Sequence, residues 1–454
     1  MMTTLSDMIA RLGQYLLCVH RVQAGRYRYA RTVERNLKLS VEEIHADRII
    51  RLRQTIENAY IHSPFYRARF QAVGFEPGDL KDPADLRRLP VLTKTDLRDH
   101  VDEMVGDNVN PHEVERSVSG GTTGLPVSFI RDKFCVDYRR GIDLALSRYY
   151  GWCDGQWQGL LWGAAHEVVY RQGFKARFTQ LWADRVFALD CNRLSDATYE
   201  EFVTRARQYR PSFVLAYPSL AYDLAERIEA GRVSPVRVPV INVTAEPLYD
   251  FQRRKIESVL AERVYARYGA REIGTVAFEC PQRAGLHIIP QSVYIEVIPL
   301  EGQSQTGVVL VTDLLNRAMP LIRYRIGDLA RLDESPCECG LTSPRLLEIK
   351  GRETDIIWRP DGTGLPGTEI VTIVGEVGLQ ARVQIVQEKL DDVVIRLEGN
   401  STPDAAVQRL LDKFHRVIGG GIRFRVQRVN EIERARSGKY RYVISHVSRP
   451  EGTV

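Results

Sequence analysis

Ser117-Val-Ser-Gly-Gly-Thr-Thr-Gly-Leu-Pro126 carries the strongest single signal in this chain, and it runs directly into Val127-Ser-Phe-Ile130. Its glycines let the backbone turn sharply and approach a ligand closely. The hydroxyl groups of Ser119, Thr122 and Thr123 add donors to the backbone amides, so the segment can wrap a polyphosphate. It is not a Walker A loop, because that motif needs a Gly-Lys-Ser/Thr triplet that opens a helix. By itself, the segment is also typical of an ordinary polar turn.

The composition is that of an ordinary globular protein. With 454 residues, of which 27% are charged and 44% hydrophobic, the chain can bury a sizeable core and form more than one domain. Lys and Arg number 63 against 58 Asp and Glu, and no long basic run occurs, so no nucleic-acid partner is expected. No segment reaches the ~18 apolar residues of a membrane span. Seven scattered cysteines are too few for a disulfide framework, which favours a cytoplasmic location.

The N-terminal residues 8–39 have a helix-like pattern rich in Arg and Tyr. Such a helix can cover the main domain, or it can lie on a membrane or on a partner, and we expect the first of these. The sequence leaves open whether the chain forms a homodimer.

Short apolar runs alternate with helical patterns beyond residue 150. Residues 159–163, 213–217 and 238–244 have the pattern of buried strands, and residues 199–208 and 219–230 that of helices. This alternation predicts an α/β fold with substantial parallel sheet. Residues 286–332 are predicted to be mostly β.

A domain boundary is expected near Lys350-Gly-Arg352. It would separate a large N-terminal domain (residues 1–350), with mixed sheets flanked by helices plus a β-rich subdomain, from a small C-terminal domain (residues 351–454). The small domain is predicted to have a ββαβ order, with strands at 381–387, 392–397 and 422–429 and a helix at 403–417.

Four further motifs contain residues suited to nucleotide chemistry. In Tyr268-Gly-Ala-Arg-Glu272, a carboxylate at a strand-to-loop corner suits Mg²⁺, although Glu272 could equally be solvated or paired with an arginine. In Pro320-Leu-Ile-Arg-Tyr-Arg-Ile-Gly-Asp328, an aspartate after a glycine turn can accept two hydrogen bonds from ribose hydroxyls. Gly351-Arg-Glu-Thr-Asp355 and Arg436-Ser-Gly-Lys439 follow. Each motif alone is weak evidence for a nucleotide site, but the order and spacing of all the motifs together are not weak evidence.

Together these motifs resemble the adenylate-forming superfamily of acyl-CoA synthetases, adenylation domains and luciferases, and within it the phenylacetate-CoA ligase and CapK-like branch. The resemblance runs from residues 59–66 and 89–94 to Lys439. Arg271 and the phrase Glu279-Cys-Pro…Gly-Leu-His287 look specifically CapK-like.

The resemblance implies ATP and Mg²⁺ as cofactors and assigns a role to each motif. It implies a catalytic set of Lys439, Glu272 and Arg271, with Glu272 on Mg²⁺. The residues that would bind the nucleotide are Ser119, Gly121, Thr122, Thr123 and Gly124 (phosphate loop), Ala245, Glu246 and Pro247 (adenine side), Tyr268 and Gly269 (aromatic position), Asp328 (ribose) and Arg352 (phosphate and hinge).

The implied reaction joins a carboxylic acid to AMP and releases pyrophosphate. Lys439 would stabilise the charge that develops between the carboxylate and the α-phosphate, a kind of contact typically worth roughly 10²–10³-fold in rate. The acyl group would then pass to CoA after the small, mobile C-terminal domain swings about the hinge.

The chain departs from the family pattern at one residue of the loop and in the hinge segment. Leu125 stands where the loop usually has a lysine, so that phosphate contact is absent or supplied elsewhere, with Arg271 as one candidate. The hinge segment Arg352-Glu-Thr-Asp355 lacks the paired acidic residues that are common there. This difference concerns how freely the small domain reorients, and therefore the thioester step more than adenylation.

A structural zinc site is expected from four ligands with a Cys-x₆-His and a Cys-x-Cys-Gly spacing. Thiolate and imidazole donors in such a set suit tetrahedral Zn²⁺, and the resemblance supports it, since some CapK-like members carry zinc here. The alternative is three unconnected buried thiols and a surface histidine. The candidate ligands are Cys280, His287, Cys337 and Cys339.

The acyl pocket is expected between the phosphate loop and the adenine segment, where an aromatic wall would suit an aryl or arylacetic acid. The candidate lining residues are Trp162, His166, Tyr217 and Pro218, which could equally belong to the core. The leading hypothesis is therefore an acid-CoA ligase. The alternatives are adenylation followed by transfer to an amine, a hydroxyl or a carrier protein in polysaccharide or natural-product biosynthesis, and a non-catalytic nucleotide-binding scaffold.

Overall fold

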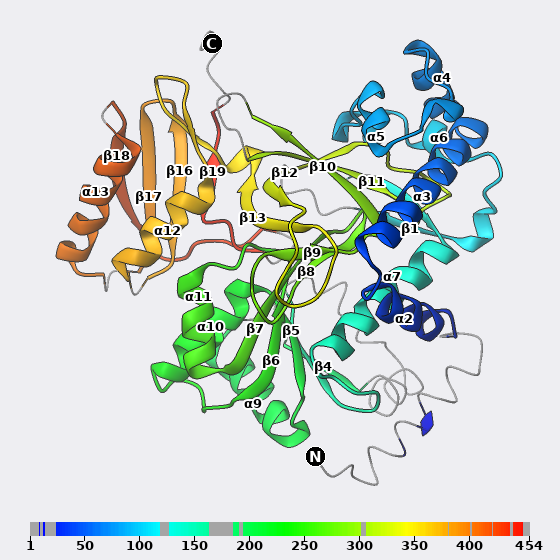
Figure 1. Cartoon of the computed structure of the whole chain (residues 1–454). Helices are drawn as coiled ribbons and strands as arrows, with labels where there is room; N and C mark the ends of the chain where they lie inside the picture. Colours follow the sequence, from blue (N-terminus) through cyan, green and yellow to red (C-terminus); the bar gives the residue numbers. More distant parts are fainter. Residues whose placement is uncertain are drawn as a thin grey trace.

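The computed structural model describes residues 9, 12–13, 24–118, 127–162, 185–189, 194–300, 306–379, 381–399, 402–419, 421–435 and 439–447. Figure 1 shows a large N-terminal part around one long, twisted sheet and a smaller C-terminal part beside it, in orange and red. Within the described ranges, the long sheet has 11 strands in the order β10-β11-β12-β13-β9-β8-β7-β6-β5-β3-β4. The α/β class predicted from the sequence is confirmed.

One half of this sheet is parallel. It comprises β3 (Gln158–Leu161), β4 (Val186–Ala188), β5 (Phe213–Ala216), β6 (Val238–Val243) and the first part of β7 (Ala261–Ala270). The connecting helices are α9 (Asp196–Tyr209), α10 (Pro218–Glu229) and α11 (Asp250–Val259).

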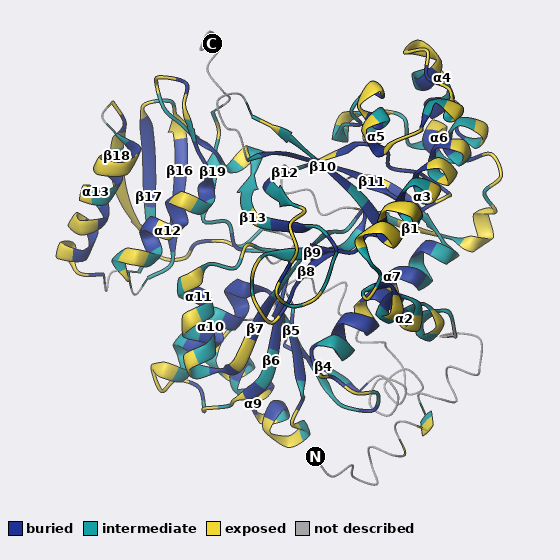
Figure 2. Ribbon diagram, viewed as in Figure 1, coloured by how far each residue is buried: buried dark blue, intermediate teal, exposed yellow. Residues whose placement is uncertain are grey.

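Alternate residues of the buried strand β5 face opposite sides of the sheet. Val214 and Ala216 pack in the core that contains α9 and α10, whereas Phe213 packs in the core that contains α7 (Lys133–Tyr149). Helices therefore cover both faces of the parallel strands (Figures 1 and 2), which is why the strand sequences are continuously apolar.

The other half of the sheet is antiparallel. It comprises β8 (Gly274–Glu279), β9 (Leu286–Ile288), β10 (Val293–Pro299), β11 (Gly307–Asp313), β12 (Tyr324–Asp333) and β13 (Arg345–Arg352). A separate hairpin of β1 (Val114–Val118) and β2 (Ser128–Asp132) flanks the glycine-rich segment, and Val118 pairs with Ser128.

The N-terminal helices pack around the large sheet. A break at Ser63-Pro64 separates α3 (Val41–His62) from α4 (Pro64–Ala72). The short helices that follow are η1 (Pro77–Asp79), η2 (Pro83–Arg88), α5 (Lys94–Asp99), α6 (Val101–Met104) and η3 (Pro111–Glu113). Helix α2 (Ala24–Asn36) lies on α7, where a β-carbon at Gly141 would stand 2.9 Å from the backbone nitrogen of Ala30. Residues 24–36 thus form the covering helix that the sequence predicted.

The C-terminal part has its own four-stranded sheet, in the order β18-β17-β16-β19. Its elements are η5 (Glu353–Asp355), β14 (Ile357–Trp358), β15 (Gly364–Leu365), α12 (Gly367–Val377), β16 (Val383–Lys389), β17 (Asp392–Glu398), α13 (Asp404–Ile418), β18 (Arg423–Val429) and β19 (Val443–Ser445). The predicted ββαβ order corresponds to β16, β17, α13 and β18, and the structure adds α12 and β19. The boundary near residue 350 stays a prediction, since β13 runs through it to Arg352.

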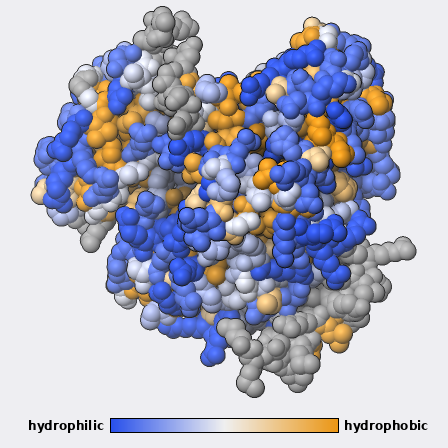
Figure 3. Space-filling model, in the orientation of Figure 1, coloured by the Kyte–Doolittle hydropathy of each residue, from blue (hydrophilic) through white to orange (hydrophobic). Residues whose placement is uncertain are grey.

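The face drawn in Figure 3 is mostly hydrophilic, with hydrophobic residues in scattered patches. Every helix within the described ranges is too short or too polar to cross a lipid bilayer. The cytoplasmic location stays a prediction.

Candidate active site

A cavity of about 740 Å³ lies between the large sheet and the C-terminal part. It brings together predicted site residues from distant parts of the chain. Those that line it are Tyr217, Ala245, Glu246, Pro247, Tyr268, Gly269, Arg271, Glu272, Asp328, Arg352 and Lys439. The phosphate-loop residues Ser119, Gly121, Thr122, Thr123 and Gly124, together with Leu125 and His166, lie outside the described residues.

Asp328 lies on β12 at one wall of the cavity and is buried. The hydroxyl of Tyr268 donates to Asp328 Oδ2 at 2.7 Å, and Arg352 Nε lies 3.5 Å from Oδ1. Burial raises the pKa of Tyr268 well above its usual value, with Asp328 adding to the effect, so the tyrosine keeps the proton that it donates. Each carboxylate oxygen accepts two hydrogen bonds, so Asp328 keeps capacity for the ribose hydroxyls predicted for it.

Glu272 lies in the tight turn between β7 and β8. A β-carbon at Gly269 would stand 2.3 Å from the carbonyl oxygen of Gly274, so the chain can turn this sharply only with glycine there. Beneath the turn, the buried Arg139 of α7 donates to the carbonyl of Glu272 at 2.8 Å and pairs with Asp313 at 2.6 Å. A buried ion pair therefore fixes the backbone of the predicted magnesium ligand.

Arg271 points toward the start of the glycine-rich segment. Its Nη1 donates to the carbonyl of Val118, the last residue of β1, at 2.8 Å. Val118 is the last described residue before the segment, so this hydrogen bond places Arg271 at the point where the β1 strand ends. Its role in offsetting phosphate charge stays a prediction.

Lys439 enters the cavity from the C-terminal part. Burial lowers its pKa, the positive charge of Arg352 lowers it further, and Glu246 and Asp328 oppose the shift. Arg352 lies at the end of β13, where Asp328 and Asp355 outweigh burial and raise its pKa. The two cations thus approach the same wall as Asp328.

Lys94 is a cavity residue to which the sequence assigned no role. Leu92 forms a parallel bridge with Tyr324, and the next residue, Thr93, caps α5 through Asp96. A β-carbon on Gly327 would stand 3.8 Å from Lys94 Nζ, which places the amine beside the glycine turn before Asp328.

The electrostatics of Lys94 resemble those of Lys439. Burial and Arg352 lower the pKa of Lys94, whereas Glu272 and Asp328 raise it. In the sequence, Lys94 is marked only by its place in residues 89–94, which belong to the family resemblance. The strand bridge that brings it to the cavity joins residues more than 200 positions apart, so no local pattern indicates this location.

The carboxylate of Glu246, in the predicted adenine-side segment, is held by groups of the protein. Its Oε2 accepts from the amide of Ser219 at 3.0 Å, and its Oε1 accepts from the Ser219 hydroxyl at 3.1 Å and from the amide of Tyr440 at 2.7 Å. The carboxylate is therefore directed at the first turn of α10 and at the C-terminal part. An adenine contact by the backbone of residues 245–247 stays a prediction.

The predicted acyl pocket is described only in part. The rings of Trp162 and Tyr217 lie 4.7 Å apart, and Pro218 opens α10 directly behind Tyr217. Two nearby tryptophans belong to the core, since Trp157 stacks on Tyr209 at 3.9 Å and Trp152 is buried.

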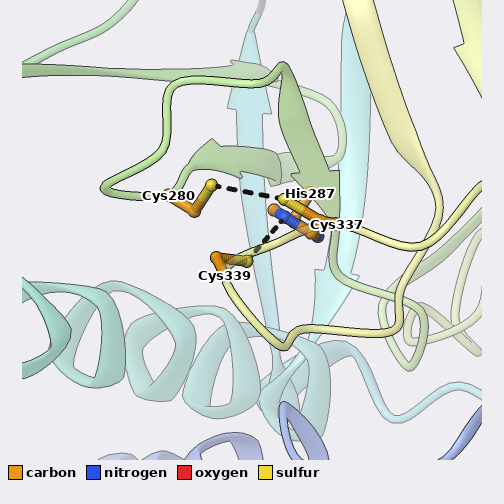
Figure 4. Close-up of side chains that lie close together, drawn as sticks. All are labelled: Cys280, His287, Cys337 and Cys339. Atoms are coloured by element: carbon orange, nitrogen blue, oxygen red, sulfur yellow. Dashed lines mark hydrogen bonds between the residues drawn. The ribbon is translucent and has the colours of Figure 1, made fainter.

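The four predicted zinc ligands meet at one point (Figure 4). Cys280 follows β8, His287 lies on β9, and Cys337 and Cys339 lie between β12 and β13; their ligand atoms are all within 4.8 Å of one another. The Sγ atoms of Cys280 and Cys337 are 3.9 Å apart, and Cys339 Sγ lies 3.3 Å from His287 Nε2.

These distances fit the predicted metal. Two sulfurs on a tetrahedral zinc with Zn–S bonds of about 2.3 Å would be about 3.8 Å apart. On the far side of the ring, His287 Nδ1 lies 3.2 Å from both the carbonyl and the hydroxyl of Ser343, which orient the imidazole. Burial lowers the pKa of His287 to about 4, so the ring is neutral near pH 7. Unconnected thiols are thus ruled out.

The chain is similar in sequence to proteins of known family. Residues 357–446 match the CapK C-terminal domain family. The chain is 30% identical over 329 residues to the phenylacetate-coenzyme A ligase of Escherichia coli (strain K12), which covers 70% of this chain and 73% of the relative.

Solved structures of 2-hydroxyisobutyryl-CoA ligase share the fold. The postadenylation state in complex with 2-HIB-AMP is 25% identical and has a TM-score of 0.70, covering 90% of this chain and 91% of the other. The thioesterification state of the same enzyme, at 23% identity and the same coverage, has a TM-score of 0.58. The arrangement of this chain is therefore more similar to the postadenylation state.

Proposed function

Because the chain belongs to the phenylacetate-CoA ligase family of adenylate-forming ligases, we propose that it activates an aryl or arylacetic acid with ATP and transfers the acyl group to CoA. The observation that carries the proposal is the single cavity in which Glu272, Asp328, Arg352 and Lys439 meet from four separate segments. Membership of a ligase family leaves no support for a non-catalytic scaffold.

The residues of the cavity have separate roles in adenylation. Asp328 binds the ribose hydroxyls, and Glu272 holds Mg²⁺, which would neutralise phosphate charge. A buried carboxylate that lines the cavity fits that ion. Lys439 stabilises the charge that develops as the carboxylate attacks the α-phosphorus and pyrophosphate leaves. Arg271 and Lys94 supply the positive charge that the phosphate loop lacks at Leu125.

The acid is proposed from the described part of the pocket. The rings of Trp162 and Tyr217 lie 4.7 Å apart at an interplanar angle of 52°, and Tyr217 lines the cavity. Their apolar aromatic surface favours an aromatic ring over a charged or short aliphatic chain.

Zinc has a structural role in this proposal. Cys280, His287, Cys337 and Cys339 form a complete donor set with no vertex left for a substrate, so the metal would tie the β8–β9 turn to the β12–β13 loop.

Acid-dependent exchange of labelled pyrophosphate into ATP, measured across a panel of aryl, arylacetic and aliphatic acids, tests the proposal. We expect exchange with aromatic acids and its loss in Lys439→Ala. No exchange with any acid, or an unchanged rate in Lys439→Ala, would refute it.

The acceptor is tested by the mass of the product with and without CoA. A second candidate is transfer to an amine, a hydroxyl or a carrier protein. It is supported by the match of residues 357–446 to the CapK C-terminal domain family and by the unusual hinge segment 352–355. It predicts AMP release that does not depend on CoA.

A further inference from the structure

One carboxylate bridges the N-terminal and C-terminal parts next to the predicted catalytic lysine. Glu246, in the loop after β6, accepts from the amide and the hydroxyl of Ser219 within the N-terminal part. Across the boundary, it accepts from the amide of Tyr440 at 2.7 Å. That amide is covalently bonded to the carbonyl of Lys439, so the contact is one peptide unit from the lysine.

The carboxylate is held rigidly on its own side. Ser219 is the second residue of α10, a helix of 12 residues whose first amides carry partial positive charge and favour an anion. Ala245, immediately before Glu246, has a φ of +74°, a backbone conformation that residues other than glycine rarely adopt. A strained backbone next to a doubly hydrogen-bonded carboxylate indicates that the position of Glu246 is set by function.

Tyr440 is held equally firmly on the other side. Its side chain is buried, and its hydroxyl donates to the carbonyl of Val383 at the start of β16 at 2.9 Å. A second link comes from Arg434, whose Nη1 donates to the Ser219 hydroxyl at 2.8 Å. The segment on both sides of the lysine is therefore attached to the first turn of α10.

We infer that Glu246 is a positioning residue that holds Lys439 in the cavity for adenylation and releases it for the second half-reaction. The inference rests on the proposed function. The hydrogen bond to Tyr440 crosses the boundary between the two parts, so it must break when the C-terminal part reorients. The greater similarity to the postadenylation state agrees with a contact made during the first half-reaction.

Loss of the Glu246 contact should slow adenylation without slowing the transfer of the acyl group to CoA. Loss of a hydrogen bond to a charged acceptor is expected to lower the fraction of protein with Lys439 in place roughly ten- to a hundred-fold. Glu246→Ala should lower kcat of pyrophosphate exchange by that factor, with KM for ATP unchanged. Consumption of supplied acyl-adenylate by CoA should stay at the wild-type rate or increase. Glu246→Gln keeps one acceptor oxygen, so its kcat of pyrophosphate exchange should lie between that of the wild type and that of Glu246→Ala.

Glu229→Ala serves as the matched control, because Glu229 lies at the other end of α10 with its side chain 56% exposed. It should leave both half-reactions unchanged. A rise in KM for ATP without a change in kcat of exchange would show that Glu246 contacts adenine and would overturn the inference. An equal loss in both half-reactions would overturn it too, since that is the effect of general misfolding.

A readout without turnover keeps the inference separate from the proposed function. The rate at which an amine-reactive reagent modifies Lys439, followed by mass spectrometry of the intact enzyme, should rise roughly ten-fold or more in Glu246→Ala. An unchanged rate would overturn the inference. If the wild type shows no exchange with any acid but Lys439 becomes reactive in the variant, the proposed function fails and the positioning role stands.

Discussion

Replacement of Arg139 by methionine should destabilise the protein and weaken magnesium binding together. The side chain of Arg139 is 7% exposed and that of Asp313 is fully buried, and the two pair at 2.6 Å. Methionine has a similar length without the charge, so Asp313 would be left buried with no counter-charge. Removing one partner of such a pair costs about 3–5 kcal/mol of unfolding free energy. The lost hydrogen bond to the Glu272 carbonyl adds about 1 kcal/mol.

The size of the loss should depend on pH in a defined direction. Burial raises the pKa of Asp313 in the folded protein, and removing Arg139 would raise it further. A carboxyl group whose pKa is raised on folding stabilises the protein at low pH, and this contribution is lost as pH rises through the folded pKa. The variant should therefore be weakest near neutral pH and recover part of its stability as pH falls and Asp313 takes up a proton.

Urea denaturation at two pH values, together with the magnesium dependence of pyrophosphate exchange, measures both effects. Arg140→Met is the matched control, because Arg140 is the next residue of the same helix and its side chain is 57% exposed. The magnesium concentration at half-maximal exchange should rise only in the Arg139 variant. A loss below about 1 kcal/mol at pH 7, the size of a single neutral hydrogen bond, would refute the reasoning.

Three further predictions concern the charges and the metal. Lys94→Ala should lower the rate of pyrophosphate exchange roughly 10²-fold with KM for the acid unchanged. Lys133→Ala, at an exposed lysine, should have no effect. Equal rates in both variants would show that Lys94 does not face the phosphates. Cys337→Ser should lower the zinc content, measured by elemental analysis, from about one to less than about half an equivalent, and a metal-free wild type would contradict the site. Burial lowers the pKa of Lys439, and catalysis needs its charged form, so the adenylation rate should fall with rising pH at a value below the usual lysine range. Lys439→Arg should move that fall to higher pH. A rate that does not change with pH in the wild type would refute the role of Lys439.

Local sequence patterns predicted most of the secondary structure. The α9 and α10 helices were predicted within a few residues of their bounds, because apolar periodicity and N-caps act over one or two turns. Helix α12 was missed. Its sequence Gly367–Val377 is rich in β-branched residues and glycine, which favour other structures, and it is helical because its apolar face packs in the C-terminal core.

Ligand sets with short spacings were also predictable. Cys337 and Cys339 are two residues apart and Cys280 and His287 seven apart, so the donor chemistry could be read directly, and the β-sheet then brought the two pairs together. Glu272, Asp328 and Lys439 were identified because each lies in its own short motif, whose order follows the family.

The sequence by itself determined the fold class, the family and the types of residue at the cavity, because these depend on local periodicity and on motifs a few residues long. Only the tertiary structure decided how the cavity is assembled. Arg139 and Lys94 lie far along the chain from the turns that they contact, and nothing in their own neighbourhoods indicates the partners. The motif of Glu246 predicts an adenine-side position, and only the fold shows that its carboxylate accepts hydrogen bonds from Ser219 and Tyr440, which are close in space and distant in sequence. The glycine-rich segment of residues 117–126 predicts a phosphate site from its own residue types, whereas the charges that line the cavity, among them Lys94, Arg271 and Lys439, come together only through the packing of distant elements.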